Sequence, residues 1–449
     1  MYGIERYYDH YVITRNGEVL FHVDSLLEAE RELEKLNGKQ SEIKGKVVNS
    51  QRYNNYHKHT HYSNIRTLDC VSKPEDYMKR AVELGHTTYF TTEHGFQGNI
   101  FEANTLCEKY GLKCIFGVEA YYVDDMYDKS SRSNYHIMLV AMNDNGRKEI
   151  NKIMSLANTD GFYYKPRIDL KCLLSLTPTD TIVTTACVAS RMFKYGWEES
   201  FLKPMLNHFG KNFYLEVQSH NESIQINHNK MLLKVKEKYN IGLIHANDSH
   251  YIKPEDSKYR DLFLNAKGMY YEDESNFILD YPDSDTIIER YRVQGVLNEE
   301  QIQEALNNTL IFDNAESIKL DKEFKIPKIT KGNSDMVLRK IIADAWKEEK
   351  KNISQKRIKE YEQAIYYEMD IIKNCGMADY FILDHKIIKK AINEYNAVLT
   401  RSGRGSAVSF YVNRLLGLTE IDRLKSPITL YPTRFMSAER ILSSRSLPD

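Results

Sequence analysis

The chain has 449 residues, of which 42% are hydrophobic and 28% charged, and a formal net charge of −1. This length is too great for one ordinary hydrophobic core and predicts two or three domains, and the near-neutral charge confines any nucleic-acid-binding surface to a local patch. No apolar run approaches the roughly 20 residues that cross a membrane, and the amino terminus lacks the pattern of a signal peptide, so we expect a cytoplasmic protein with no membrane partner. Six scattered cysteines without a Cys-x-x-Cys pair indicate reduced thiols.

The first fifty residues differ in pattern from the rest. Apolar strands are expected at 11–14 and 19–23, on either side of Asn16-Gly17, which is typical of a tight hairpin turn. Apolar residues at helical spacing predict a helix over 25–36. We therefore expect a small ββα appendage at 1–50, and we find no candidate site residue in it.

From residue 51 onward, predicted strands and helices alternate. Ser72 to Glu75 forms a capping box with Pro74 in the first turn, which predicts a helix that ends near Leu84. Another helix is expected over 100–109. This alternation implies parallel strands whose carboxyl ends gather on one face, as in a βα barrel. The predicted strands are 87–91, 114–118, 136–140, 181–185 and 241–245.

Residues of metal-ligating type recur in this region, mostly after the predicted strands. His57 and His59 are two positions apart, so on a strand both imidazoles lie on the same face and are available to one ion. A histidine-rich loop is by itself more often exposed to solvent or packed than bound to a metal. The recurrence of ligand-type residues further along the chain favours metal binding. Imidazole and thiolate suit zinc, whereas carboxylates suit manganese or magnesium. The recurring residues are Asp69, Glu93, His94, Glu119, His136, Cys187, Asp248 and His250.

Clustered divalent ions activate water near neutral pH and neutralise charge on a phosphoryl group. Arg167 is a candidate phosphate clamp, because a guanidinium group binds phosphate in a bidentate way. An equally good interpretation is an arginine in a surface loop. Both interpretations are open on the sequence alone.

The carboxyl-terminal part has a different organisation. A helix is expected at 297–312 and an extended linker at 324–329, with a domain boundary near 330, followed by helices over 334–346 and 357–374. The glycine-rich loop 402–407 then opens a predicted helix over 408–416. Backbone N–H groups at such a junction bind phosphate, and Arg401 and Arg404 add positive charge. A loop of this composition is also common as a simple turn.

Several motifs resemble the polymerase-and-histidinol-phosphatase (PHP) domain. They lie at 57–63, 92–95, 117–121, 161–169 and 246–251. The resemblance implies a distorted βα barrel over 51–330 that binds up to three ions. Extra residues separate Ser63 from Asp69, and Glu93 replaces an aspartate of the family and is interpreted as orienting His94. The nine implied ligands are His57, His59, Asp69, His94, Glu119, His136, Cys187, Asp248 and His250.

A complete ligand set implies activity rather than a scaffold role. Intact members of the family resemble manganese- or zinc-dependent 3′-5′ exonucleases, and Asp248, His250 and Arg167 would be the catalytic residues. In members with a degraded ligand set the domain is a scaffold. A free-standing PHP phosphatase and a non-catalytic, metal-stabilised scaffold are the alternative functions.

Residues 331–449 resemble the beginning of the palm of C-family replicative polymerases, the bacterial and bacteriophage DNA polymerase III α subunits. The matching motifs lie at 378–381, 403–407, 416–422, 434–436 and 447–449. The resemblance implies that Gly403, Arg404, Gly405 and Ser406 bind the triphosphate of a dNTP and that the α/β barrel is followed by a mainly helical segment and a polymerase β-like palm.

The family's catalytic aspartates follow a Pro-Asp pair, so they are expected after Pro448-Asp449, and this chain lacks the dyad. The implied function is templated DNA synthesis in DNA replication, with magnesium, once the missing catalytic part is supplied. Implied partners are primer-template DNA, a carboxyl-terminal polymerase half or downstream sequence, a sliding clamp and other replisome subunits. A truncated chain and a naturally split polymerase both fit.

Overall fold

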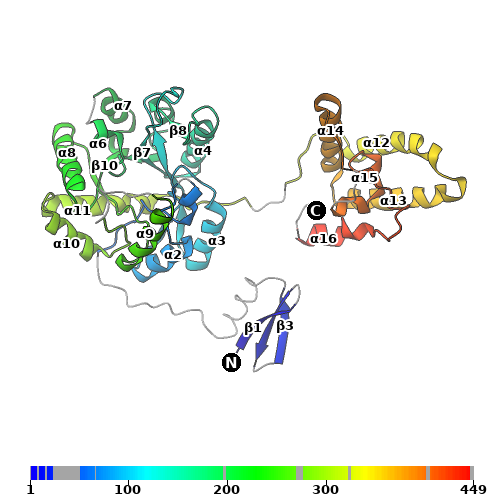
Figure 1. Cartoon of the computed structure of the whole chain (residues 1–449), viewed down its shortest axis with the longest axis horizontal. Helices are drawn as coiled ribbons and strands as arrows, with labels where there is room; N and C mark the ends of the chain where they lie inside the picture. The colour runs from blue at the N-terminus through cyan, green and yellow to red at the C-terminus, as the bar shows by residue number, and fades with distance from the viewer. Residues whose placement is uncertain are drawn as a thin grey trace. The chain divides into compact units, whose positions relative to one another are not determined.

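The structure, a computed structural model, describes residues 2–7, 10–15, 18–23, 51–65, 67–195, 199–268, 277–321, 325–400 and 405–444. The chain divides into two compact units, Met1–Leu320 and Asp321–Asp449 (Figure 1). The sequence placed this division near 330. Among the described residues, no helix is long and apolar enough to cross a membrane.

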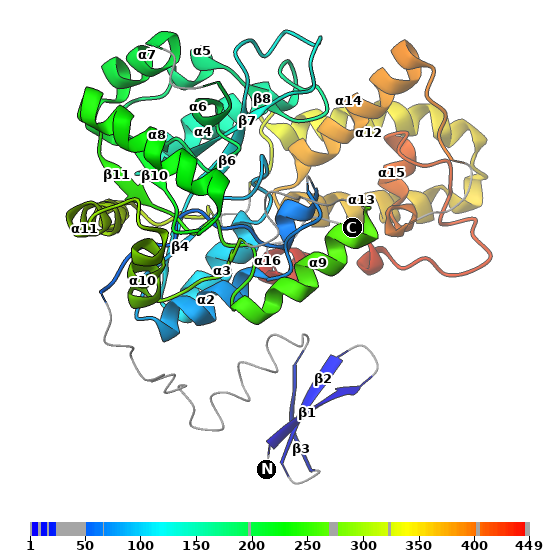
Figure 2. The same ribbon diagram turned by 60° about the vertical axis from the view of Figure 1, so that its left-hand side comes forward.

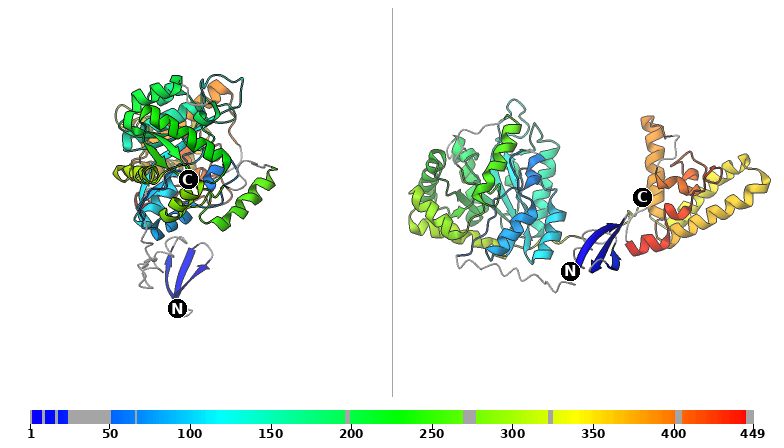
Figure 3. Two further views of the ribbon diagram at one scale, coloured as in Figure 1. Left: turned by 90° about the vertical axis from the view of Figure 1, so that its left-hand side faces the viewer. Right: turned by 60° about the horizontal axis from the view of Figure 1, so that its bottom comes forward.

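The amino-terminal strands form a small antiparallel sheet in the order β1-β2-β3 (Figure 3). The predicted hairpin corresponds to β2 and β3, and β1 is a third strand that the sequence analysis missed. The predicted turn at Asn16-Gly17 and the predicted helix 25–36 lie outside the described residues. The strands are β1 (Tyr2–Tyr7), β2 (His10–Arg15) and β3 (Glu18–Val23).

The main sheet has six strands in the order β11-β10-β9-β7-β6-β8, and β4 and β5 form a separate parallel pair. Helices flank these strands (Figures 1 and 2), so the predicted α/β class is confirmed. The strands are β4 (Thr88–Phe90), β5 (Lys113–Ile115), β6 (Gly117–Tyr122), β7 (Tyr135–Ala141), β8 (Arg167–Ile168), β9 (Thr181–Thr184), β10 (Phe213–Val217) and β11 (Leu243–His245).

The prediction that all strands are parallel is wrong for β7. This strand runs antiparallel to both β6 and β9, whereas β9, β10 and β11 are parallel to one another. The reason is local: residues 123–134 join β6 to β7 without a helix, so no crossover returns the chain to the same end of the sheet. The predicted strand 114–118 also divides at Phe116 into β5 and β6.

The helices of the first unit cover the sheet and bury a continuous apolar core. At α2 the capping residue is Lys73, whose N–H donates to the Asp76 carboxylate at 2.8 Å, one position later than the predicted Ser72–Glu75 box. The helices are α2 (Pro74–Glu83), α3 (Ile100–Tyr110), α4 (Asp144–Asn158), α5 (Leu170–Leu173), α6 (Arg191–Tyr195), α7 (Glu199–Phe209), α8 (Ser223–Tyr239), α9 (Ser257–Ala266), α10 (Ser284–Gln294) and α11 (Glu299–Asn308).

Two isolated bridges link segments near the ends of the strands, and one of them lies in the segment that precedes η1 (His61–Ile65). Lys58 pairs with Ser249, which follows β11, and His94, which follows β4, pairs with Glu119 in β6. The Thr92 hydroxyl donates to the carbonyl of Lys58 at 3.1 Å. These contacts bring the ends of β4 and β11 and the middle of β6 to one place.

The second unit contains helices joined by turns and loops, and its described residues, 321, 325–400 and 405–444, form no strand. The predicted helices 334–346 and 357–374 are confirmed. The predicted helix 408–416 is confirmed only over Tyr411–Leu415, because the chain forms a 3-10 turn over Ser406–Ser409 and is extended at buried Phe410. The helices are α12 (Ser334–Glu349), α13 (Ile358–Asn374), α14 (Ala378–Tyr395), α15 (Tyr411–Leu415) and α16 (Ala438–Ser444).

Candidate metal centre

All nine predicted ligands lie in one cluster of the first unit. Eight of them fall into groups of three whose ligand atoms lie within 4.8 Å of one another. The ninth, Cys187, has its Sγ 3.6 Å from Nδ1 of His136. The groups are His57-His59-Asp248, His59-His94-His250, His94-Glu119-His136 and Asp69-Cys70-His250.

Glu119 lies at the centre of the cluster. Its Oε1 is 3.1 Å from Nε2 of His57 and 2.9 Å from Nδ1 of His136, and its Oε2 contacts Nδ1 of His94. Burial raises the pKa of Glu119, but the imidazoles of His136, His94 and His57 outweigh that effect and hold it well below its usual range. Glu119 is therefore an ionised carboxylate that bridges imidazoles from several elements.

Asp248 is a second shared carboxylate. Its Oδ1 lies 3.2 Å from Nε2 of both His57 and His59. The residue has a left-handed backbone with φ of 51°, and Ala186, directly before Cys187, has φ of 58°. Such conformations are unfavourable for residues other than glycine and concentrate at functional sites. They orient Asp248 and Cys187 at the ends of β11 and β9.

The outer edge of the cluster contains Asp69 and His250. Asp69 Oδ2 is 3.5 Å from Nε2 of His250 and 4.0 Å from Arg260, while the Cys70 thiol donates to Oδ1 at 3.2 Å. Although the spacing before Asp69 is unusual for the family, the side chain reaches the cluster. Nδ1 of His250 is 2.7 Å from the backbone carbonyl of Asp248, which directs Nε2 toward Asp69.

The donor set fits bound divalent ions. Buried ligand atoms converge here whose contacts are mainly with one another and which form no hydrogen bond among the described residues, and buried polar atoms without a hydrogen bond are rare in folded proteins. Imidazole nitrogen and carboxylate oxygen are also the donor types that zinc and manganese accept. The atoms are Nε2 of His57, Nε2 of His59, Nδ1 of His94, Oε2 of Glu119 and Oδ1 of Asp248.

Glu216 in β10 supports His57 and was missed by the sequence analysis. Its Oε1 is 2.7 Å from Nδ1 of His57, and its Oε2 accepts hydrogen bonds from the hydroxyls of Tyr56 and Thr184 at 2.7 and 2.8 Å. This contact fixes the ring so that Nε2 faces the cluster. A carboxylate within the apolar run Phe213–Val217 was the available signal.

Glu93 was predicted to orient His94, but the hydrogen bonds of its carboxylate go to other side chains. Its carboxylate accepts hydrogen bonds from the hydroxyls of Thr60 and Ser63 at 2.7 and 2.6 Å and from Asn99 at 2.8 Å. Ser63 in turn lies 3.3 Å from Nδ1 of His59. The longer side chain of glutamate reaches the 60–63 turn, so Glu93 supports His59 instead.

A cavity of about 250 Å³ opens onto the cluster. Beside the ligands, its wall contains Tyr121, Asn134 and two cationic residues, Lys165 and Arg260. The ammonium of Lys165 is 3.3 Å from the Tyr121 hydroxyl. The cavity therefore combines a metal-ligating wall with positive groups suited to an anionic substrate.

The structure does not support Arg167 as a phosphate clamp. The residue is 1% exposed, and its guanidinium donates to the carbonyls of Gly161, Ser131 and Asp128 at 3.3, 3.1 and 2.8 Å. Lys165, in the same motif, lines the cavity instead. Arg167 is thus a structural residue that holds the neighbouring loops.

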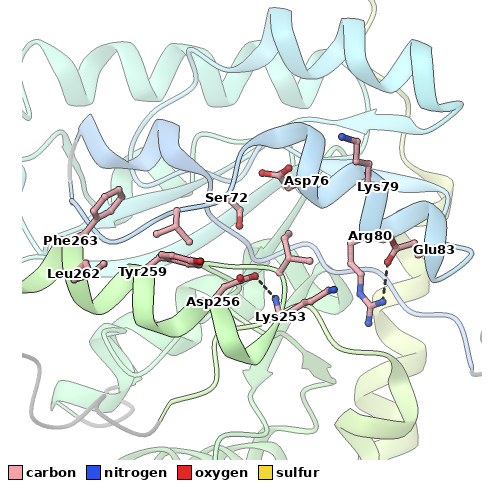
Figure 4. A pocket seen from close by; sticks show the side chains of 12 residues that line it. Ser72, Asp76, Lys79, Arg80, Glu83, Lys253, Asp256, Tyr259, Leu262 and Phe263 are labelled. Carbon is pink, nitrogen blue, oxygen red and sulfur yellow. Dashed lines mark hydrogen bonds and ion pairs between the residues drawn. The ribbon is translucent and has the colours of Figure 1, made fainter. Parts of the chain in front are cut away.

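A larger hollow, of about 640 Å³, lies between α2 and α9 and contains none of the cluster ligands (Figure 4). Its charged side chains are engaged locally: the Arg80 guanidinium donates to Glu83 at 3.3 Å, and the Asp256 carboxylate accepts from the Lys253 N–H at 3.1 Å. We assign it no chemistry.

The predicted triphosphate site is only partly described. Gly403 and Arg404 lie outside the described residues, while Gly405, with φ of 80°, precedes the turn that begins at Ser406. The amino terminus of α15 does not offer a free anion site, because the Glu368 carboxylate accepts from the N–H of Val412 at 2.8 Å. Any phosphate contact would therefore depend on the Gly405-Ser406 turn rather than on a helix terminus.

Metal binding is expected to release protons and to weaken as the pH falls. Burial lowers the pKa of His57, but Glu216, Asp248 and Glu119 outweigh it and raise the pKa above its usual range; the pKa values of His136 and His250 are also raised, with carboxylates likewise outweighing burial. Burial and Asp248 raise the pKa of the Cys187 thiol. Ions must displace these protons, so affinity rises with pH. Titration calorimetry in buffers of different ionisation enthalpy measures the proton release.

We expect more than one manganese or zinc ion per chain by elemental analysis, and fewer in the double variant His57→Ala, His59→Ala. His208→Ala is the matched control, because Nε2 of His208 lies 2.7 Å from the carbonyl of Leu176, outside the cluster. Less than one ion per wild-type chain after either metal is supplied would show that the cluster is not a polymetal site.

Two known families match parts of this chain. Residues 55–220 match the family described as PHP domain, and residues 337–449 match the family described as bacterial DNA polymerase III alpha NTPase domain. Curated relatives named DNA polymerase III subunit alpha are similar over both units. The protein of Aquifex aeolicus is 29% identical over 438 residues, and that of Borreliella burgdorferi is 30% identical over 423 residues.

These alignments cover 89% of this chain but 36% and 35% of the two relatives, so the chain spans about a third of their length. Among solved structures, a two-domain protein of Bacteroides vulgatus, described as containing a predicted PHP-like metal-dependent phosphoesterase, is similar at 13% identity and a TM-score of 0.31. The match covers 55% of this chain and 74% of that chain.

Proposed function

Because this chain corresponds to the amino-terminal part of DNA polymerase III α subunits, as its sequence predicted, we propose that it acts in a replicative polymerase and carries a metal-dependent phosphodiesterase in residues 51–330. One observation is the main support for the phosphodiesterase proposal. Nine ligand-type side chains converge beside a cavity whose wall also contains Lys165 and Arg260. A cluster with both donors for metal ions and cationic side chains suits a phosphate ester.

Within this site, His57, His59 and Asp248 would hold one ion, and His94, Glu119 and His136 a neighbouring one. Manganese or zinc fits the mixture of imidazole, carboxylate and thiol. Bound divalent ions supply a nucleophilic water near neutral pH and neutralise phosphoryl charge.

Lys165 and Arg260 would bind the non-bridging phosphate oxygens from the cavity wall. His250, fixed through its Nδ1 by the Asp248 carbonyl, presents Nε2 on the side of Asp69. It would act as a ligand together with Asp69 at the outer edge of the cluster. Asp248 would act as a carboxylate ligand together with His57 and His59.

The proposed substrate is the 3′ end of single-stranded DNA, since the family resemblance implies a 3′-5′ exonuclease. With manganese, a 5′-labelled oligonucleotide is expected to shorten stepwise from its 3′ end, and a 3′ label is expected to be released in the first step. A chelator should stop both. Hydrolysis of small phosphate esters without DNA degradation would support a phosphatase instead, and the absence of any hydrolysis from the metal-loaded protein would support a scaffold.

For the second unit, we propose the beginning of a polymerase palm over residues 331–449. Gly405 and Ser406, with Gly403 and Arg404, would contact a dNTP during magnesium-dependent synthesis on primer-template DNA. The catalytic aspartates for this synthesis would be supplied by a downstream or separate polymerase part. A sliding clamp and other replisome subunits are the corresponding partners.

We also propose that the strands of the first unit form a distorted βα barrel. Support comes from bridges at the edges of the two sheets. Lys58 pairs with Ser249 beyond β11, and His94 pairs with Glu119 beyond β4. The segment around Lys58 would thereby link the β11 edge to β4, and β4 would link to β6.

A further inference from the structure

Exposed aromatic side chains gather on two loops that also form part of the cavity wall. The loop 123–134 connects β6 to β7, and the loop 161–166 leads into β8. They carry Tyr127, Phe162 and Tyr164, whose exposed fractions are 61%, 45% and 53%. The same loops contribute Asn134 and Lys165 to the cavity that opens onto the metal ligands.

The two loops are fixed to each other. Arg167 donates to carbonyls on both, with Asp128 on one and Gly161 on the other. Lys129 crosses between them and donates to the carbonyls of Asp160 and Phe162 at 2.8 and 3.2 Å. A Cβ at Gly161 would lie 2.1 Å from the Arg167 carbonyl oxygen, so only glycine permits this approach. The exposed aromatic rings are consequently held on a preorganised base.

Tyr164 is held in an unfavourable backbone conformation. Its φ of 60° is uncommon for a bulky residue and is the kind of strain that collects at binding sites. The guanidinium of Arg132 lies 3.8 Å from the centre of the Tyr164 ring, and the Tyr163 ring meets it edge-on at 4.8 Å. A flat ring beside a cation is therefore presented next to Lys165.

The acidic residues of the first loop have partners either within the loop or in α6. Asp125 accepts from the N–H of Tyr127 at 2.9 Å, and Asp128 accepts from the N–H of Ser130 at 2.8 Å. Asp124 pairs with Arg191 at 2.6 Å. Asp125 and Asp128 thus accept hydrogen bonds from the loop itself and Asp124 pairs with α6, while Arg132 and Lys165 supply the positive charge beside Tyr164 and the cavity.

We propose that Tyr127, Phe162, Tyr164 and Arg132, called the rim surface, bind single-stranded nucleic acid and direct its terminal phosphodiester into the cavity. Unpaired bases stack on aromatic rings irrespective of sequence, and arginine contributes both cation–π contact and phosphate binding. A duplex does not expose its base faces along the strand, so single strands are favoured. The claim that the terminal phosphodiester enters the cavity rests on the proposed function, whereas the claim that bases stack on the rim surface does not.

The test is binding of fluorescein-labelled dT20 to the full chain, measured by anisotropy in a chelator so that no hydrolysis occurs. Tyr164→Ala is expected to weaken binding by about fivefold or more, because stacking on one aromatic ring contributes at least that much. Tyr164→Phe keeps the ring and should bind as wild type does. Phe101→Ala is the matched control, since Phe101 is 72% exposed on α3 of the same unit.

Equal binding of dT20 by Tyr164→Ala and wild type would contradict the proposal that the rim surface binds nucleic acid. A loss of affinity in Tyr164→Phe as large as that in Tyr164→Ala would also contradict it. Arg132→Gln gives a second test that leaves the Tyr164 backbone unchanged, and it should also weaken binding. Hydrolysis of bis(p-nitrophenyl) phosphate separates the two proposals, because this small ester does not need stacking. Ring-dependent binding without any hydrolysis by wild type would support the rim surface and contradict the phosphodiesterase.

Discussion

Substitution of Asp248 by asparagine is expected to reduce manganese-dependent degradation of single-stranded DNA by more than about a hundredfold, because loss of residues that merely support metal ligands already lowers activity by about 10- to 100-fold. Asp248 Oδ1 is shared by His57 and His59 and has no hydrogen-bond donor of its own among the described residues. Asparagine has nearly the same shape but cannot act as an ionised ligand.

Asparagine is also compatible with the backbone conformation at position 248. Asp248 has φ of 51°, and asparagine is among the residues that accept this conformation best. The fold should therefore be preserved, which near-ultraviolet circular dichroism would check. Asp144→Asn, at an exposed position in the first turn of α4, is the matched control and should retain activity. Equal residual activity in Asp248→Asn and wild type would indicate a contaminating nuclease and favour the scaffold function.

Replacement of Glu93 by alanine is expected to lower the free energy of unfolding of the first unit by about 3–5 kcal/mol, the range observed when one member of a buried ion pair is removed. Lys58 is 2% exposed, and its ammonium lies 3.9 Å from Glu93 and 3.8 Å from the centre of the Tyr89 ring. The substitution leaves this charge without its carboxylate. It also removes the acceptor for Thr60 and Ser63. Calorimetric unfolding of the full chain would measure the loss.

The loss should depend on pH in a defined direction. Burial lowers the pKa of Lys58 to about 8, even though the Glu93 carboxylate acts to raise it. Without Glu93 this pKa falls further, so at neutral pH the unfolded chain binds a proton that the folded variant does not. Stability then rises with pH wherever the unfolded state binds more protons, so the deficit of Glu93→Ala should shrink as the pH rises toward about 8, above which Lys58 is neutral in both folded proteins.

The double variant Glu93→Gln, Lys58→Met provides the control for this interpretation. It removes both charges and keeps an acceptor for the 60–63 turn, so we expect it to recover most of the stability that Glu93→Ala loses. A loss of less than about 1 kcal/mol in Glu93→Ala, or no recovery in the double variant, would show that the buried ion pair is not what stabilises the loop.

The ligand cluster was accessible from the sequence because each side chain carries its own chemistry. A His-x-His pair, a carboxylate inside an apolar strand and an Asp-x-His pair have the donors for metal ions wherever they lie, and the order of the motifs identified the family before any contact was known. The α/β class followed from the alternation of apolar runs. The sequence could not specify which other side chains would contact these ligands.

Strand direction is one property that only the tertiary structure decided. Local pattern identifies β7 as a strand, but its antiparallel pairing with β6 and β9 depends on a connection without a helix. Glu216 is another example. Its role follows from the parallel pairing of β10 beside β9, which brings it to His57 from a position 159 residues away in the chain.

Lys165 and Arg167 show the same limit within a single motif. Both are cations two positions apart, and regular alternation would direct them to the same face of a strand. Lys165 instead lies in the turn that pairs it with Tyr163, whereas Arg167 begins β8, so the two residues do not alternate within one strand. Lys165 consequently lines the cavity, and Arg167 is buried against loop carbonyls. Residue type and spacing indicated that a cationic side chain from this motif would lie at the site. The path of the backbone, which long-range packing sets, determined that this side chain is Lys165 and not Arg167.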